Sequence, residues 1–190
     1  GSHVARALEE AGHEVVRFDR LSTGREVLAG GRPLVRASLL DRDRVLEALT
    51  GCDAVAHLAG SALVGESVLR PEIYWRNNLV AGLTLVECMA EAGVDKLVFA
   101  STCAVYGPST VPIDEAAPKA PINPYGASKL AMERLLADVR AARGLRSVAL
   151  RFFNAAGAHE RGDIGELHDP ETHLVPIVLQ VLAGRRERVI

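Results

Sequence analysis

Short β-rich runs alternate with helical segments along almost the whole chain, and this alternation constrains the fold more than any other feature. Strands are predicted over residues 14–18, 34–36, 54–58, 97–100 and 147–151. Helices are predicted over residues 4–11, 42–49, 71–91, 125–143 and 174–183. Strands separated by helices at this spacing form βαβ units, so we expect a parallel sheet covered by helices on both faces. In such sheets ligands bind beyond the carboxyl ends of the strands.

Length and composition narrow the class of protein further. A chain of 190 residues normally makes one domain, and a hydrophobic content of 48% supplies a core. The net charge of −2 gives no reason to expect nucleic acid or an anionic membrane as partner. No apolar run is long enough to span a bilayer, and no signal peptide is apparent.

The cysteines and histidines bear on compartment and metal binding. The cysteines, Cys52, Cys88 and Cys103, are scattered and odd in number, which favours a reducing, cytoplasmic compartment over a disulfide framework. The six histidines show no ligand spacing, so no histidine cluster and no metal site are predicted.

The run of residues 124–129, Pro-Tyr-Gly-Ala-Ser-Lys, says most about chemistry. Asn123 is a good N-cap and Pro124 a good first helical residue, so a helix is predicted to begin just before Tyr125. Tyr125 and Lys129 then share one helix face. An ammonium beside a phenol lowers the phenol pKa from about 10. Such a tyrosine can exchange a proton with a substrate hydroxyl, although a chance surface pair is the alternative.

Several short motifs are spread along the chain. They are residues 1–4, 11–16, 21–24, 57–60, 64–67, 77–78, 101–107, 125–129, 151–158 and 169–176. Together they resemble the extended short-chain dehydrogenases/reductases, the NAD-dependent epimerase/dehydratase family, and most closely its UDP-glucose 4-epimerases. The resemblance implies a doubly wound, Rossmann-like α/β sheet. It places an NAD-binding domain over residues 1–151 and the start of a substrate-binding region over residues 152–190.

The resemblance also implies a reaction. A nucleotide-sugar 4-epimerase holds NAD tightly and transiently oxidises the sugar at C4, here interconverting UDP-glucose and UDP-galactose. The resemblance implies that Tyr125 is the base that removes the O4 proton. Lys129 is its electrostatic partner and a ribose ligand, and Thr102 supplies the hydroxyl that hydrogen-bonds the sugar O4.

Binding residues are implied in the same way. The cofactor contacts are Gly1, Asp19, Leu39, Leu58, Ala59, Asn77, Tyr125, Lys129 and Phe152. The substrate contacts are Thr102, Tyr125, Asn154, His173 and Leu174. Asp19 has its own rationale, because a carboxylate at this strand end accepts from ribose hydroxyls and repels a 2′-phosphate, which favours NAD over NADP. Asn77 is a poor helix former, so a cofactor or loop contact would explain it, with a solvated face as the alternative.

The chain departs from the family pattern at its ends. Gly1 matches the last glycine of the family's glycine-rich turn, and the first strand is not in the chain. Because that strand lies in the middle of the order 3-2-1-4-5-6, the strands at 14–18 and 54–58 should lose their shared neighbour. We therefore expect a fragment that is poorly stable and inactive by itself. In the full-length protein, helices 71–91 and 124–143 are expected to form a homodimer.

Two alternatives stay open. The first is another NAD-dependent sugar-nucleotide epimerase or dehydratase. A dehydratase needs an acidic pair directly after the threonine, and here Cys103-Ala104 follows Thr102. The second is a non-catalytic NAD-binding or scaffold fragment. The intact set of Thr102, Tyr125 and Lys129 argues against this for the full-length protein, whereas the expected truncation keeps it open for this chain. The sugar carried by the nucleotide stays undetermined.

Overall fold

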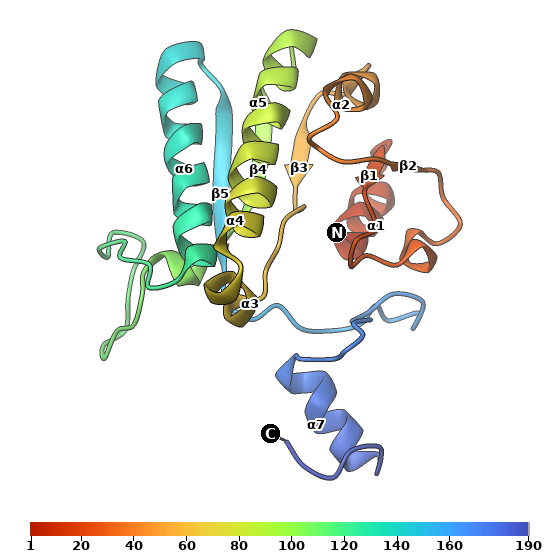
Figure 1. The fold of residues 1–190 in the computed structure, drawn as a ribbon. Helices are drawn as coiled ribbons and strands as arrows, with labels where there is room; N and C mark the ends of the chain where they lie inside the picture. Colours follow the sequence, from red (N-terminus) through yellow and green to blue (C-terminus); the bar gives the residue numbers. More distant parts are fainter. Residues whose placement is uncertain (190) are drawn as a thin grey trace. The chain divides into compact units, whose positions relative to one another are not determined.

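The computed structural model describes residues 1–189, which fall into two compact units. One unit is Ala37–Phe153, and the other joins Gly1–Arg36 to the segment that begins at Asn154. Helices alternate with strands, and every strand pairing is parallel (Figure 1). The predicted α/β class is confirmed. The predicted domain boundary at residue 151 stays a prediction.

The unit Ala37–Phe153 is built on a three-stranded parallel sheet in the order β3-β4-β5. The strands are β3 (Val55–His57), β4 (Lys96–Thr102) and β5 (Arg146–Phe152). The principal helices are α2 (Arg42–Leu49), α5 (Ala81–Ala92) and α6 (Pro124–Arg143). Helices α5 and α6 run side by side along the sheet, and α2 packs on α5 (Figure 1). The carboxyl ends of β4 and β5 coincide, because Thr102 lies opposite Phe152.

Alternating burial along β4 shows how this sheet forms its core. Leu97 and Phe99 are buried, whereas Val98 between them is 45% exposed. Successive side chains of a strand point to opposite faces, so one face of β4 meets the helices. Met89 of α5 and Met132 of α6 are fully buried and complete this core.

The segment predicted as one helix over 71–91 is divided by a π-helical turn. It comprises α4 (Pro71–Tyr74), the turn η2 (Trp75–Val80) and α5. A helix that the sequence did not predict, α3 (Val64–Leu69), precedes it. A π-helical turn changes the direction of the side chains that follow and often lies at functional sites.

The second unit contains fewer buried groups. Its elements are α1 (Ser2–Glu10), β1 (Arg17–Asp19), η1 (Glu26–Ala29), β2 (Leu34–Arg36) and α7 (Leu174–Leu182). The strands β1 and β2 pair in parallel, with Phe18 opposite Val35. Of its described residues only Arg6 and Ile164 are buried. Arg6 of α1 donates to the carboxylate of Asp163 at 2.8 Å and so joins the two chain segments of the unit.

Within residues 1–189, β1–β2 and β3–β4–β5 are separate sheets. As expected from the sequence, β1 and β3 each pair with a single strand. No helix in this part of the chain has the length and apolarity needed to cross a bilayer. The turn η3 (Cys103–Val105), directly after β4, leads toward the candidate site.

Candidate active site

Helix α6 begins where the sequence predicted and carries Tyr125 and Lys129 on its first turns. The Asn123 side chain accepts from the Gly126 amide at 2.8 Å and caps the helix. A Cβ at Gly126 would come within 2.5 Å of the Ala104 carbonyl oxygen. Only glycine therefore lets the start of α6 approach the turn that follows β4.

Thr102, the last residue of β4, meets Tyr125 at this approach. Thr102 is 6% exposed, and its hydroxyl oxygen accepts from the Ala104 amide at 3.1 Å. Burial raises the pKa of the Tyr125 phenol, while its hydrogen bond with Thr102 acts in the opposite direction. The sequence predicted a lowered phenol pKa, and that direction is wrong for the chain by itself, because burial outweighs the favourable contact.

The Lys129 ammonium is bound to the backbone of β4. It is 5% exposed, donates to the Ala100 carbonyl at 2.9 Å and lies 4.8 Å from the centre of the Phe99 ring. Burial lowers the pKa of Lys129 to about 8, so the side chain is still mostly charged at neutral pH. The ammonium thus stabilises the end of β4, and the phenol pKa is governed by its own burial.

His57 at the end of β3 lies behind this pair. It is 2% exposed, and its ring stands 5.5 Å from the Phe99 ring. Its Nε2 atom has no hydrogen-bond partner among the described residues. Burial, together with the charge of Lys129, lowers the pKa of His57 to about 3, so the imidazole is neutral.

Two asparagines of the π-helical turn hold the loop after β3. Asn78 accepts from the Ser61 amide at 2.7 Å, and it donates to the Ser61 carbonyl and to the Ser128 hydroxyl, each at 3.0 Å. Asn77 donates to the Ser61 hydroxyl at 2.9 Å. Gly60 approaches so closely that a Cβ would lie 2.8 Å from Asn78 Oδ1. The loop contact expected of Asn77 is present, and Asn78, which was not among the predicted site residues, holds the same loop.

Seven predicted site residues therefore lie at or beyond the carboxyl ends of β3, β4 and β5. They are Leu58, Ala59, Asn77, Thr102, Tyr125, Lys129 and Phe152. Leu39 belongs to the same unit and lies half-buried in the turn before α2. The arrangement agrees with the rule that ligands bind at this edge of a parallel sheet.

The other predicted site residues belong to the second unit. Asp19 ends β1, where one oxygen accepts from the Leu21 amide at 2.7 Å and thereby shapes the following loop. Gly1 is the N-cap of α1, Asn154 is exposed, and Leu174 is 68% exposed at the start of α7.

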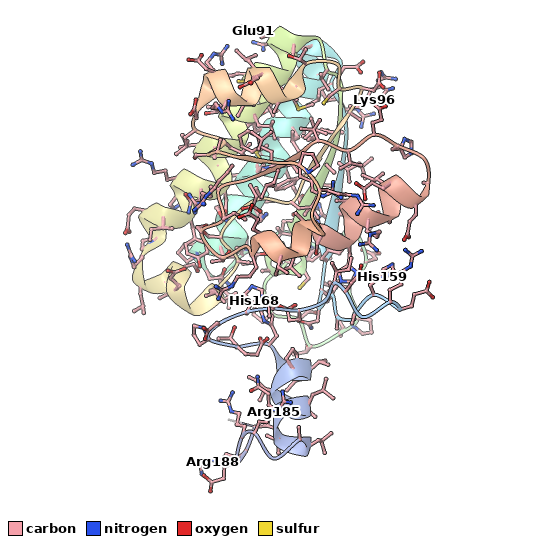
Figure 2. All side chains as sticks on the ribbon, turned by 90° about the vertical axis from the view of Figure 1, so that its right-hand side faces the viewer. Glu91, Lys96, His159, His168, Arg185 and Arg188 are labelled. Atoms are coloured by element: carbon pink, nitrogen blue, oxygen red, sulfur yellow. The ribbon has the colours of Figure 1, made fainter. Side chains whose placement is uncertain are left out.

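His173 belongs to a cluster that the sequence analysis did not expect. Its Nδ1 lies 2.8 Å from Glu171, and its ring is 4.6 Å from that of His168, whose Nδ1 contacts Glu166. The prediction that no histidines cluster is wrong, because His168 and His173 meet across the bend at residues 169–170. His168 lies on the segment before α7 (Figure 2). Both Nδ1 atoms are engaged by carboxylates and the histidines are exposed, so we interpret the cluster as ion pairs rather than an open metal-ligand set.

The comparisons with known proteins agree with this geometry. The Epimerase family model, described as the NAD dependent epimerase/dehydratase family, matches residues 1–190. The chain belongs to this family. The family resemblance predicted from the sequence is thereby confirmed.

Individual family members are similar over the whole of this chain. It is 48% identical to a Streptomyces lividans UDP-glucose 4-epimerase, with 100% of this chain and 58% of that enzyme covered. It is 51% identical to an Azospirillum brasilense UDP-glucose 4-epimerase, with 98% of this chain and 55% of that enzyme covered. The crystal structure of UDP-glucose 4-epimerase from Brucella ovis in complex with NAD matches with a TM-score of 0.95 and 44% identity. The match covers 100% of this chain and 59% of that one. The chain thus spans less than two thirds of these relatives.

The residues at this edge fit the NAD that the family name implies. Ala59 and Gly60 are exposed just beyond β3, and a side chain at Gly60 would collide with Asn78. Lys129 has three N–H donors, of which the Ala100 carbonyl takes one. The ammonium can therefore donate to a ribose hydroxyl while staying bound to β4.

Proposed function

We propose that the protein containing this chain is an NAD-dependent UDP-sugar 4-epimerase that interconverts UDP-glucose and UDP-galactose. The observation that carries the proposal is the convergence of Thr102, Tyr125 and Lys129 at the carboxyl end of β4. Relatives named UDP-glucose 4-epimerase, at 48% and 51% identity, support this choice of reaction.

In the proposed reaction the Tyr125 phenolate accepts the proton of the sugar O4 hydroxyl, and the phenol so formed later returns it. The Thr102 hydroxyl hydrogen-bonds the phenol, orients it and favours its ionised form. When bound, NAD would supply the acceptor for the hydride that leaves the sugar C4. It would also supply a positively charged ring whose charge favours the phenolate. Lys129 adds a second positive charge and holds the end of β4 in place.

The remaining predicted roles belong to the same proposal. Asp19 and Asn77 would contact NAD, while Asn154, His173 and Leu174 would contact the nucleotide-sugar. A homodimer through α4–α5 and α6 is supported by exposed apolar side chains there, Trp75 at 38% and Leu83 at 39% exposure, and light scattering tests it. The three free cysteines support a cytoplasmic location, which cell fractionation tests.

The decisive variant is Tyr125→Phe in the product of the complete reading frame that encodes this chain. Removal of the phenol oxygen should lower kcat for UDP-galactose by about 10²–10⁴-fold, the usual contribution of general acid–base catalysis. Bound NAD, measured after denaturation, should be largely retained, because the other predicted cofactor contacts are kept. Thr102→Val should also lower kcat, and Thr110→Val, at an exposed threonine, is the matched control. Unchanged epimerisation by Tyr125→Phe would exclude the proposed role.

A dehydratase is the second candidate, and the same protein separates the two reactions. No carboxylic acid follows Thr102, since Cys103 and Ala104 occupy the next two positions. Formation of a 4-keto-6-deoxy product would favour a dehydratase, whereas galactose and glucose isomers alone favour the epimerase.

A further inference from the structure

An ion pair between Arg151 and Glu133 lies next to the candidate site. Arg151 is the second-last residue of β5, and Glu133 lies in the middle of α6. The guanidinium donates to both carboxylate oxygens, from Nε to Oε1 at 3.0 Å and from Nη2 to Oε2 at 2.7 Å. The two side chains are only 20% and 10% exposed. Such a two-pronged contact fixes both position and orientation.

Two further residues complete the arrangement. The Ser101 hydroxyl donates to Glu133 Oε1, and Arg151 Nη1 donates to the Tyr106 hydroxyl. The guanidinium also lies 4.9 Å from the centre of the Tyr106 ring. We call Ser101, Tyr106, Glu133 and Arg151 the Arg151 clamp. It joins the ends of β4 and β5, the residue after η3, and helix α6.

The clamp shares a helix face with the site. Tyr125, Lys129 and Glu133 follow one another at intervals of four residues, so they project from the same side of α6. Each contacts a different residue of the consecutive stretch Ala100–Thr102 in β4. Glu133 is therefore the third anchor between α6 and the strand that carries Thr102.

We propose that the Arg151 clamp positions Tyr125 against Thr102, and that Glu133 and Arg151 are positioning residues for proton transfer. This inference rests on the proposed function, because it assigns the clamp to that same site. Loss of either partner would leave a largely buried charge unpaired and free α6 to shift along β4. A displacement of about 1 Å at a reacting group can lower a rate by about 10²-fold.

A second arginine of β5 offers a matched control. Arg146, at the start of the strand, makes a two-pronged contact with Asp95, from Nε to Oδ2 at 3.1 Å and from Nη2 to Oδ1 at 2.6 Å. This pair is mostly exposed and lies at the amino ends of β4 and β5, away from Thr102. Asp95→Asn therefore removes a comparable contact without touching the clamp.

The first test measures the Tyr125–Thr102 contact in the product of the complete reading frame. Tyrosines labelled with ¹³C at Cζ are titrated by NMR, and the Tyr125 signal is assigned with Tyr125→Phe. Thr102→Val should raise the titration midpoint of Tyr125, since it removes the bond that favours the phenolate. When Thr102→Val is combined with Glu133→Gln or Arg151→Lys, it should shift the Tyr125 midpoint by less than about half as much. The clamp variant has then already weakened the Tyr125–Thr102 contact. In Asp95→Asn it should keep its full size.

An undiminished shift in the folded clamp variants would overturn the proposal. If Glu133→Gln and Arg151→Lys do not fold, as judged by circular dichroism, Tyr106→Phe provides a milder change. It keeps the ring and the ion pair and removes only the hydroxyl acceptor, so a partial reduction of the shift is expected. An unreduced shift in folded Tyr106→Phe then overturns the proposal.

The second test is kinetic and uses the product of the complete reading frame. Glu133→Gln should lower kcat for UDP-galactose by about 10–100-fold, with KM changed by less than about threefold, because binding groups are retained. Asp95→Asn should leave both constants within about twofold. Equal kinetics in wild type and Glu133→Gln would overturn the proposal. If the wild type itself does not epimerise, the proposed function fails, and the NMR experiment still decides the role of the clamp.

Discussion

The two units of the chain differ in what holds each of them together. Of the buried apolar residues in the described chain, all but Ile164 belong to Ala37–Phe153. The other unit relies on ion pairs, such as Arg6 with Asp163 at 2.8 Å and Arg17 with Glu9 at 2.7 Å. Ion pairs with little apolar packing around them contribute less than a hydrophobic core, because apolar burial dominates folding. Thr102, Tyr125 and Lys129 therefore lie on the unit that is better able to keep them in place.

The difference explains where precise geometry can be expected. Regions with few buried apolar contacts open locally at low free energy, and tightly packed cores open close to the global free energy. The contacts of α6 with β4 lie in a tightly packed core. The ion-paired loop around His173, in the other unit, is a region with few buried apolar contacts. With two units, unfolding need not be two-state, so stability is best measured segment by segment through hydrogen exchange.

The largest expected effect comes from deleting the ring under Lys129. Phe99→Ala should lower the free energy of unfolding of the unit 37–153 by about 3–5 kcal/mol, because a fully buried ring leaves a cavity. Phe153→Ala, at a residue that is 66% exposed, is the control and should change it by less than about 0.5 kcal/mol. Hydrogen exchange of β4 and α6 amides measures both. Equal effects would contradict the packing described for this unit.

An intermediate effect should appear in the pH dependence of the same unit. His57 has a pKa lowered to about 3, while an unfolded histidine titrates near 6.5. Between these values the unfolded chain binds the extra proton, so stability should rise with pH by up to about 1.4 kcal/mol per pH unit. It should be lost progressively as pH falls from about 6.5 to 3.

The contribution of His57 is isolated by comparing variants. His57→Leu should remove its part of the slope between pH 4 and 6, since nothing at this position then takes up a proton. His13→Gln, at an exposed histidine of the other unit, should leave the slope unchanged. A slope that is the same in wild type and His57→Leu would show that the imidazole is not held neutral.

The smallest effect is expected in the second unit. Asp163→Asn keeps the shape of the side chain and removes the charge that faces Arg6. Amide exchange in α1 should accelerate by less than about tenfold, because Asp163 is half-exposed and the asparagine oxygen can still accept from Arg6. Exchange in β4 should not change. A loss of protection across both units would mean that they unfold together and that the contrast between them is false.

Much of the secondary structure followed from local signals. The glycines after α5 and α6 adopt positive φ angles, 73° at Gly93 and 75° at Gly144, as helix-ending glycines do. The start of α6 was predictable because Asn123 and Pro124 act within one helical turn. The division of 71–91 was not predictable from the local sequence. Within the π-helical turn, Asn78 is hydrogen-bonded to Ser61 and Ser128, which belong to other parts of the fold.

The sequence by itself determined the α/β class, the family, and the placement of Tyr125 and Lys129 on the first turns of a helix. The class and the helix depend on periodicity and capping, and the family resemblance depends on short motifs, all of which are properties of neighbouring residues. Only the tertiary structure decided that Lys129 binds the β4 backbone, that burial raises the pKa of Tyr125, and that Arg151 and Glu133 face each other. Burial and ion pairing join residues far apart in the chain, so no local pattern contains them.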